Sequence, residues 1–325
     1  MTDHQLQPPN TFDYLKKRIT ILNERSWEGR INQNIIDDWL GNFDGRSGLP
    51  VETEQLHALY LLAQFMYFGS REIRVLLRSI YNDLFLAPLV QEVRCNLGST
   101  REQTAITDGV INELQRTRFL GVGNPSESGA HLLYYFRQEN RLSKGFFLDT
   151  AQILKRDPQQ GKRELRYPIV ERYVFVDDVC GSGETAIRYS TDFLTEITAL
   201  NPNIKAYYFC LFATAEGMQR VREHSIFKEN CGAIFELDKT YSCLDESSRY
   251  FQTCPNDISR EIARQVALSY GTLLWPSHPL GYENSQMLLG FPHNTPDNTL
   301  PMIWMERENG ASIQWTPAFR RYPKG

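Results

Sequence analysis

The sequence lacks any apolar run as long as the roughly 18–20 residues that a helix needs to cross a lipid bilayer. Its first ten residues, MTDHQLQPPN, are too polar for a signal peptide. It also lacks an excess of positive charge, because 35 Lys and Arg residues stand against 39 Asp and Glu residues. Bulk charge therefore gives no strong direct indication of nucleic-acid binding. We expect a cytoplasmic protein that does not contact a membrane.

Paired cysteines and two common nucleotide-binding loops are absent as well. The six cysteines show no C-x-x-C spacing, which is typical of reduced thiols rather than of disulfides or a zinc ribbon. Gly161-Lys162 lacks the upstream Gly and the following Ser or Thr of a P-loop. Gly121-x-Gly123 is followed by Ser126 where a dinucleotide-binding fingerprint needs glycine. These absences argue against a disulfide scaffold, a P-loop enzyme and a GxGxxG dinucleotide site.

The sequence pattern changes near residue 118. Residues 1–117 repeat apolar side chains at helical spacing, which predicts an N-terminal helical region. Between 118 and 255, apolar runs typical of buried strands alternate with helical patterns, which predicts βαβ units and a mainly parallel sheet. Residues 256–325 begin as a helix and continue as a Pro-rich, aromatic segment that we expect to pack on the core as a hood. The expected fold class is α/β.

The segment 176–186, VDDVCGSGETA, carries the clearest chemistry. A buried strand before it would deliver Asp177 and Asp178 to the carboxyl edge of the sheet, where open α/β sheets bind ligands. Gly181 and Gly183 let the backbone approach an anion and adopt positive φ. The N–H groups of such a turn and of a helix start favour a phosphate. Adjacent carboxylates and a phosphate cradle suit a ligand such as phosphorylated ribose.

This segment resembles the signature with which type I phosphoribosyltransferases bind phosphoribosyl pyrophosphate (PRPP). By that resemblance, Asp177 and Asp178 are the catalytic pair and hold the ribose 2′- and 3′-hydroxyls. The resemblance implies a Rossmann-like parallel sheet and Mg²⁺ that enters with PRPP, with no direct metal ligand from the protein. The residues that it assigns to ribose-phosphate binding are Val179, Cys180, Gly181, Ser182, Gly183, Glu184 and Thr185.

The order of the flanking segments also resembles the family. The loop after an expected strand at 119–123 would contact pyrophosphate, and the basic segment 155–166 stands where the family has a flexible lid. An ordinary solvated loop is an equally good interpretation of that basic segment. The expected pyrophosphate-loop residues are Asn124, Ser126, Ser128 and Gly129. The lid candidates are Lys155, Arg156, Lys162 and Arg163.

Two further stretches extend the resemblance over nearly the whole chain. The front end, with WLGNF at 39–43 and LYLLAQFMYF at 59–68, and the tail motif HNTPDNTLPMIW at 293–304 look like phosphoribosyltransferase-like proteins of bacterial conflict and anti-phage systems. Some of those proteins accompany retron reverse transcriptases. The resemblance implies an effector or accessory enzyme of such a system. Its N-terminal helical region would dock a protein partner from the same operon, a reverse transcriptase or a regulator.

Several alternatives stay open at this point. His293 and Asn294, polar residues among prolines, are candidates for lining the acceptor pocket, and a loop-stabilising role is the alternative. The chain either transfers or hydrolyses a glycosyl bond or is an inactive module that senses PRPP or nucleotides. Glu184, where the family often has Gly, favours the sensor. D-x-x-x-G-x-G also occurs in S-adenosylmethionine-dependent methyltransferases, but their later Asn/Asp-Pro-Pro-Tyr/Phe motif does not follow here.

Overall fold

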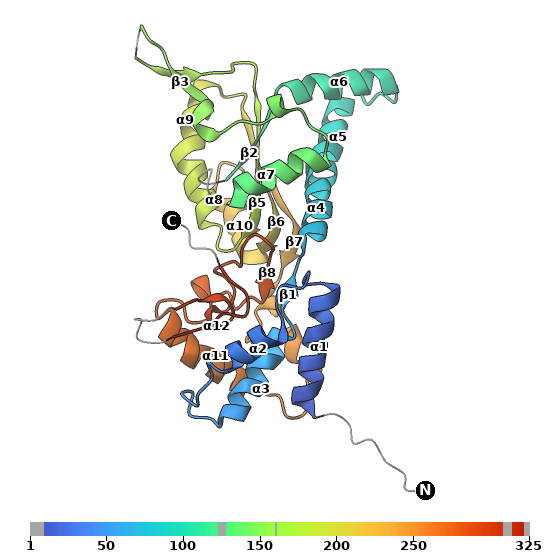
Figure 1. Cartoon of the computed structure of the whole chain (residues 1–325). Helices are drawn as coiled ribbons and strands as arrows, with labels where there is room; N and C mark the ends of the chain where they lie inside the picture. Colours follow the sequence, from blue (N-terminus) through green and yellow to red (C-terminus); the bar gives the residue numbers. More distant parts are fainter. Residues whose placement is uncertain (1–9, 123–127, 160, 308–313, 322–325) are drawn as a thin grey trace. The chain divides into compact units, whose positions relative to one another are not determined.

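A computed structural model of the chain describes residues 10–122, 128–159, 161–307 and 314–321, with only the backbone given for 128–131. The chain forms two compact units (Figure 1). The first unit combines residues 1–70 with 238–325, and the second comprises 71–237. No helix in the described ranges is both long enough and apolar enough to span a membrane.

This division differs from the three parts expected from the sequence, 1–117, 118–255 and 256–325. The helices after residue 70 belong with the sheet, because their aromatic side chains cover it: the Phe85 ring lies 5.2 Å from that of Phe119. The C-terminal segment belongs with the first 70 residues. An amphipathic pattern shows that a helix buries one face, but it does not show which partner covers that face.

The first unit is mainly helical and also contains a two-stranded parallel sheet. Residues far apart in the sequence form this sheet, because β1 pairs with β8 through Met66 opposite Leu289 and Tyr67 opposite Gly290. Its main elements are α1 (Thr11–Arg25), α2 (Gln33–Leu40), α3 (Val51–Leu62), β1 (Met66–Tyr67), α11 (Arg260–Leu274), β8 (Leu289–Gly290) and α12 (Pro301–Trp304).

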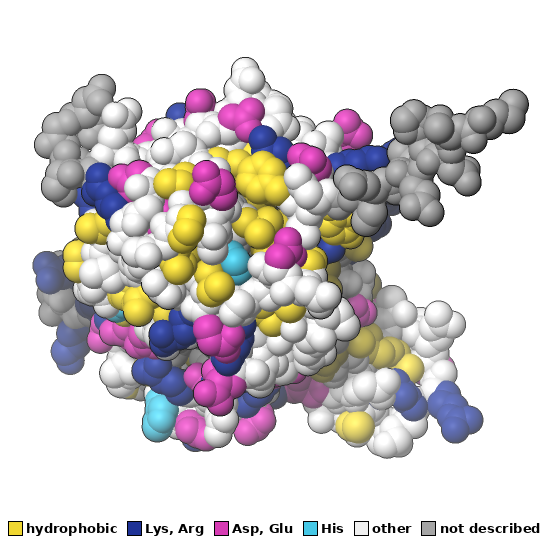
Figure 2. Space-filling model, turned by 90° about the horizontal axis from the view of Figure 1, so that it is seen from below, with side chains coloured by type: hydrophobic (Ala, Val, Ile, Leu, Met, Phe, Trp, Pro, Cys, Tyr) yellow, Lys and Arg dark blue, Asp and Glu magenta, His cyan; other side chains and the backbone are white. Residues whose placement is uncertain are grey.

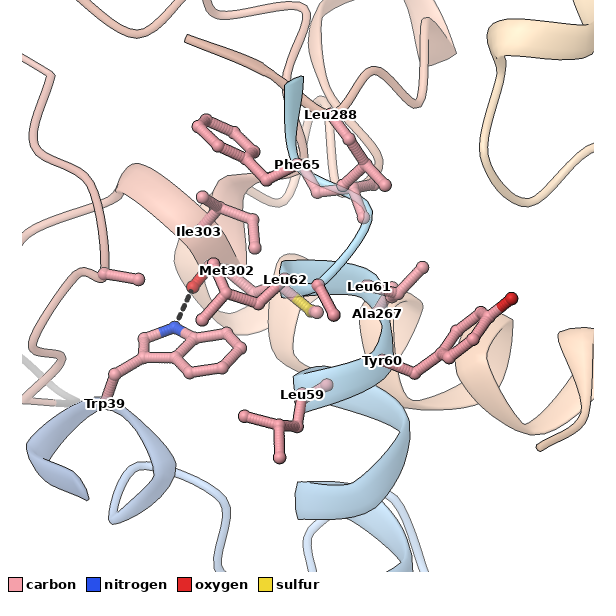
Figure 3. Packing of buried hydrophobic residues seen from close by; sticks show 14 of the residues in the cluster. Trp39, Leu59, Tyr60, Leu61, Leu62, Phe65, Ala267, Leu288, Met302 and Ile303 are labelled. Atoms are coloured by element: carbon pink, nitrogen blue, oxygen red, sulfur yellow. Dashed lines mark hydrogen bonds between the residues drawn. The ribbon is translucent and has the colours of Figure 1, made fainter. Parts of the chain in front are cut away.

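The core of the first unit joins the two ends of the chain. Figure 3 shows the side chains of α3 and α12 packed together, with the Trp39 indole beside them. The Nε1 of Trp39 donates a hydrogen bond to the Met302 carbonyl at 2.7 Å, and the Nε1 of Trp315 donates to the same oxygen at 3.2 Å. Both indoles are buried. The tail is therefore an integral part of this core.

The surface of the first unit is mixed in character. Its exposed large apolar side chains include Tyr14, Ile21, Val51, Leu268 and Leu273. Figure 2 shows the molecule from below, where apolar side chains are interspersed with acidic and basic ones. No large field of a single charge sign stands out on the face drawn there.

The second unit contains the parallel sheet that the sequence predicts. Four strands lie in the order β2-β5-β6-β7, and all neighbours are parallel. The register places Gly121 opposite Val176 and Cys180 opposite Ala213. The strands are β2 (Thr117–Gly121), β5 (Arg172–Cys180), β6 (Lys205–Thr214) and β7 (Cys231–Leu237). The α/β prediction is confirmed.

Helices cover both faces of this sheet. On one face, the Phe119 ring lies 5.2 Å from that of Phe136 on α7, and Tyr207 faces Phe85 on η1. On the other face, Phe175 packs in one cluster with side chains of the helices after β5 and β6. The helices on the Phe85 face are α4 (Ser70–Ser79), η1 (Ile80–Leu86), α5 (Ala87–Asn96) and α7 (Ser128–Glu139). Helix α6 (Gln103–Gln115) leads from α5 to β2 and has no fully buried residue. The helices on the Phe175 face are α8 (Glu184–Tyr189), η4 (Ser190–Leu194), α9 (Thr195–Leu200) and α10 (Ala215–His224).

The order in which segments are added to the sheet changes sides between β2 and β5, although the strands themselves all run parallel. After β2 and α7, the chain returns beside β2 through a parallel bridge between Phe119 and Phe147. This bridge lies on the edge of β2 away from β5, because Phe119 also pairs with Val174. After β5, the chain crosses in the opposite direction to β6. Open α/β sheets bind ligands beside the carboxyl ends of strands at such a switch point.

Candidate functional site

The two adjacent acids lie near the carboxyl end of β5, at the switch point. The strand before them is fully apolar and buried from Tyr173 to Val176, as a strand covered on both faces requires. Asp177 and Asp178 are half-buried. Strand β5 continues past them to Cys180, so the acids lie on ordered strand backbone rather than on the loop.

Both carboxylates accept hydrogen bonds from nearby groups. Asp177 Oδ1 accepts from the backbone N of Asp178 at 2.9 Å, and Asp177 Oδ2 accepts from the Tyr208 hydroxyl at 3.0 Å. Asp178 Oδ1 accepts from the backbone N of Val179 at 2.9 Å. Burial, and after it the charge of Asp178, raises the pKa of Asp177 well above its usual value, although both hydrogen bonds to Asp177 oppose that rise.

The glycine loop after β5 turns directly into a helix. Gly183 has a φ of +78° and forms the N-cap of α8, as expected, whereas Gly181, which was expected to share this freedom, does not adopt a positive φ. The Ser182 hydroxyl accepts a hydrogen bond from the backbone N of Glu184 at 3.3 Å. Glu184 and Thr185 are exposed in the first turn. The loop thus leaves its polar groups at the surface beside the acids.

The junction of β6 and α10 supports this loop through contacts that are not predicted from the sequence. The Thr214 hydroxyl donates to the Gly181 carbonyl at 2.5 Å and accepts from the backbone N of Gly217 at 2.8 Å. A Cβ on Gly217 would overlap the Gly181 carbonyl oxygen, and one on Gly183 would lie 2.7 Å from the Gly217 carbonyl oxygen. A threonine three residues before a glycine at a strand-to-helix junction is the signal that was available.

The cysteine of the motif is a packing residue. Cys180 is 3% exposed, and its side chain belongs to the apolar cluster on the α8 and α10 face. Burial, followed by the charge of Asp177, raises the pKa of the Cys180 thiol to about 12. The thiol is therefore protonated at neutral pH, which makes it a poor nucleophile.

Strand β2, which precedes the expected pyrophosphate loop in the sequence, is a parallel neighbour of β5. The carboxyl ends of the two strands therefore lie at the same edge of the sheet. Asn124 and Ser126 lie outside the described residues. Ser128 and Gly129 form the first turn of α7, where only the backbone is described.

The basic segment 155–166 contains a short antiparallel hairpin, with β3 (Leu154–Arg156) paired to β4 (Arg163–Leu165). Two of the four lid candidates form ion pairs: Lys155 with Glu164 at 2.9 Å and Arg163 with Glu196 at 2.8 Å. The other two, Arg156 and Lys162, are exposed and form no ion pair within the described residues. These two cations are the ones available to an incoming anion.

The two acceptor-pocket candidates lie in the first unit, whereas both acids lie in the second. The His293 ring stacks on Phe291 with centroids 5.4 Å apart. Asn294 accepts backbone hydrogen bonds at two oxygens: Oδ1 from Thr295 N at 3.0 Å and its carbonyl from Phe291 N at 2.9 Å. These contacts stabilise the local loop. A role in the acceptor pocket stays a prediction.

The residues around the two acids offer few protein ligands for a metal ion. In the described part of the chain, His, Cys, Asp and Glu side chains nowhere gather in a group of three that could hold a metal ion. Asp177 and Asp178 each accept a hydrogen bond from the backbone. A Mg²⁺ ion here would therefore be coordinated mainly by phosphate, hydroxyl and water oxygens of a bound ligand.

Comparisons with known proteins give the family of the chain. The family model PRTase-CE matches residues 36–321, which is most of the chain. No curated protein matches the chain. Among solved structures, the xanthine-guanine-hypoxanthine phosphoribosyltransferase of Helicobacter pylori matches with 13% identity and a TM-score of 0.24, over 46% of this chain and 76% of that one. The family match and the parallel α/β sheet together identify the chain as a member of the phosphoribosyltransferase-like family PRTase-CE.

Proposed function

We propose that the second unit binds PRPP, or a related ribose-5-phosphate or nucleotide ligand, at residues 177–185. One observation carries the proposal: paired acids at the end of β5 lead directly into a glycine loop that starts a helix, at the switch point of the sheet. The acids supply acceptors for ribose hydroxyls. The loop supplies backbone N–H groups for a phosphate.

The proposed binding mode divides the ligand between two groups of protein atoms. Asp177 and Asp178 accept hydrogen bonds from the 2′- and 3′-hydroxyls of the ribose. The backbone from Gly181 to Thr185, with the hydroxyls of Ser182 and Thr185, surrounds the 5-phosphate. Arg156 and Lys162 on the hairpin are the cations proposed to meet pyrophosphate.

The proposed reaction is transfer of the phosphoribosyl group from pyrophosphate to an acceptor, or to water. Its transition state resembles an oxocarbenium ion, so the protein acts mainly by positioning the ligand and stabilising charge. Mg²⁺ entering with PRPP would neutralise pyrophosphate charge. The two acids orient the ribose and do not need to abstract a proton.

Isothermal titration of PRPP with Mg²⁺ tests the binding proposal. We expect saturable binding to the wild type and its loss in Asp177→Asn/Asp178→Asn. The matched control is Asp108→Asn/Asp192→Asn, which removes the same charge from exposed positions in the same unit. Equal binding by wild type and site variant, or no binding by a folded wild type, would count against the proposal.

A second candidate function is ligand sensing without turnover. Glu184 favours it, because this exposed acid in the first turn of α8 places a negative charge beside the phosphate cradle. Pyrophosphate release from PRPP, measured across nucleobases, nucleosides and water, separates the two candidates. Release that disappears in Asp177→Asn/Asp178→Asn excludes the sensor. Saturable binding with no release across the panel excludes the enzyme.

The proposed biological role is in anti-phage defence, as an effector or accessory enzyme with a protein partner. It rests on the resemblance of the front end and the tail motif to proteins of conflict systems. Phage challenge of cells that express the chain with its neighbouring genes tests this role. Protection should be lost in Asp177→Asn/Asp178→Asn. Equal plating of phage with and without the genes would contradict it.

A further inference from the structure

Tyr208 on β6 places a buried hydroxyl against the candidate site. The residue is 1% exposed, and its hydroxyl donates to Asp177 Oδ2 at 3.0 Å. The other oxygen of this carboxylate accepts from the backbone N of Asp178. One donor therefore holds each oxygen, which fixes the plane of the Asp177 carboxylate.

Packing alone does not call for this hydroxyl. The Tyr208 ring lies 5.4 Å from that of Phe227, within the apolar cluster that covers the α8 and α10 face. A phenylalanine would present the same ring to this cluster. A buried hydroxyl needs a polar partner, and here that partner is the Asp177 carboxylate.

We propose that Tyr208 is a positioning residue for ribose binding, acting through Asp177. This proposal rests on the proposed function. An ionised carboxylate has about four lone-pair sites, so those not used by the two donors stay available to the ribose hydroxyls. The Tyr208 hydroxyl aims these sites and favours the ionised form that can accept hydrogen bonds.

The charges around Asp177 give this role a pH signature. Among the described residues, Asp178 on β5 and Tyr208 on β6 shift the pKa of Asp177. The thiols of Cys180 on β5 and Cys210 on β6 are affected by the Asp177 charge, and Arg220 on α10 acts on the Cys180 thiol. Burial and the Asp178 charge oppose ionisation of Asp177, whereas the Tyr208 hydroxyl supports it. Without the hydroxyl, the pKa of Asp177 rises further. At a given pH, fewer molecules then carry the carboxylate that accepts from the ribose.

Titration of PRPP with Mg²⁺ into Tyr208→Phe, on both sides of neutral pH, tests the proposal. We expect affinity near neutrality to fall by about 10- to 100-fold, the range for a hydrogen bond to a charged group. The deficit should shrink as the pH rises and Asp177 ionises. The control is Tyr207→Phe, the same change one residue earlier on β6, where the ring faces Phe85 on the opposite face of the sheet. Tyr207→Phe should bind PRPP like the wild type. Titration of the ligand phosphates affects both variants equally, so it does not account for a difference between them.

Three outcomes overturn the proposal. Wild-type affinity in Tyr208→Phe would refute it and leave the proposed function intact. A deficit of the same size at every pH would indicate a structural role. No binding by the folded wild type would refute the proposed function, and this proposal with it.

Thermal unfolding supplies a ligand-free check. In the otherwise wild-type protein, Tyr208→Phe should lower the melting temperature, because it leaves a buried oxygen of the Asp177 carboxylate without a donor. In the Asp177→Asn variant, the same substitution should lower the melting temperature much less, because residue 177 no longer carries a charge. Equal losses in the two backgrounds would contradict a hydroxyl that serves Asp177.

Discussion

Adding a single methyl group at Gly217 should disturb the candidate site, because Gly217 packs against the backbone of the glycine loop. In an open helix, Gly→Ala stabilises a protein by roughly 0.5–1 kcal/mol. Here the added Cβ would overlap the Gly181 carbonyl oxygen and lie 2.8 Å from the Thr214 hydroxyl oxygen. Such overpacking costs about 1–3 kcal/mol. The clash should outweigh the helix gain and destabilise the second unit by about 1–2 kcal/mol.

The loop should move to relieve this clash, because Gly181 is partly exposed whereas Gly217 is buried. Movement would break the hydrogen bond from Thr214 to Gly181 and misplace the phosphate cradle. We expect Gly217→Ala to lower the melting temperature of the second unit by roughly 2–8 °C and to weaken PRPP binding at least about tenfold.

The matched control for Gly217→Ala is Gly232→Ala on β7, where an added Cβ meets no atom within 4 Å. Thermal unfolding followed by circular dichroism, together with PRPP titration, should show near wild-type behaviour for this variant. The reasoning is refuted if Gly217→Ala is as stable as the wild type or more so, and binds PRPP equally well.

Two further predictions concern the stability of each unit. The Arg172 side chain at the start of β5 is 7% exposed and forms ion pairs with Glu92 and Glu113. Arg172→Met should lower the free energy of unfolding, measured in urea, by about 2–3 kcal/mol. The loss is smaller than for a fully buried pair, because both glutamates can rehydrate. The exposed ion pair of Lys155 with Glu164 provides the contrast, since Lys155→Met should lower the free energy of unfolding by less than about 1 kcal/mol. Equal losses for Lys155→Met and Arg172→Met would contradict this. In the first unit, neutral His57 donates to the Thr53 carbonyl and accepts from the backbone N of Ser259, and burial lowers its pKa. The contribution of His57 to stability is therefore present above the unfolded pKa of 6.5 and is lost as the pH falls through the lower folded pKa. His57→Gln should flatten the acid dependence of the melting temperature while exposed His224→Gln leaves it unchanged, and an unaltered slope in His57→Gln would refute this.

The sequence was most informative where one residue type serves one purpose. The apolar run from Tyr173 to Val176 predicted a strand buried on both faces, and the glycines after it predicted the turn. The sequence did not show that β5 runs on to Cys180. Aspartates are rare in strands, and here Asp177 is paired opposite Cys210 and Val179 opposite Phe212, so the ladder continues on both sides of Asp178.

Contacts between distant segments could not be predicted in the same way. Tyr208 and Thr214 read as ordinary residues of a buried strand, and only the register of β6 against β5 brings them to Asp177 and Gly181. The hairpin strands β3 and β4 have three residues each, too few to produce a visible period. The partner of each amphipathic helix likewise depends on the tertiary fold.

A crystal structure of the chain with PRPP and Mg²⁺ would show directly whether residues 177–185 hold the ligand. We expect the ribose hydroxyls to bind Asp177 and Asp178, and the 5-phosphate to lie within about 2.7–3.2 Å of backbone nitrogens between Gly181 and Thr185. A ligand bound elsewhere, with this loop and both acids making no contact to it, would show that residues 177–185 are not the PRPP site.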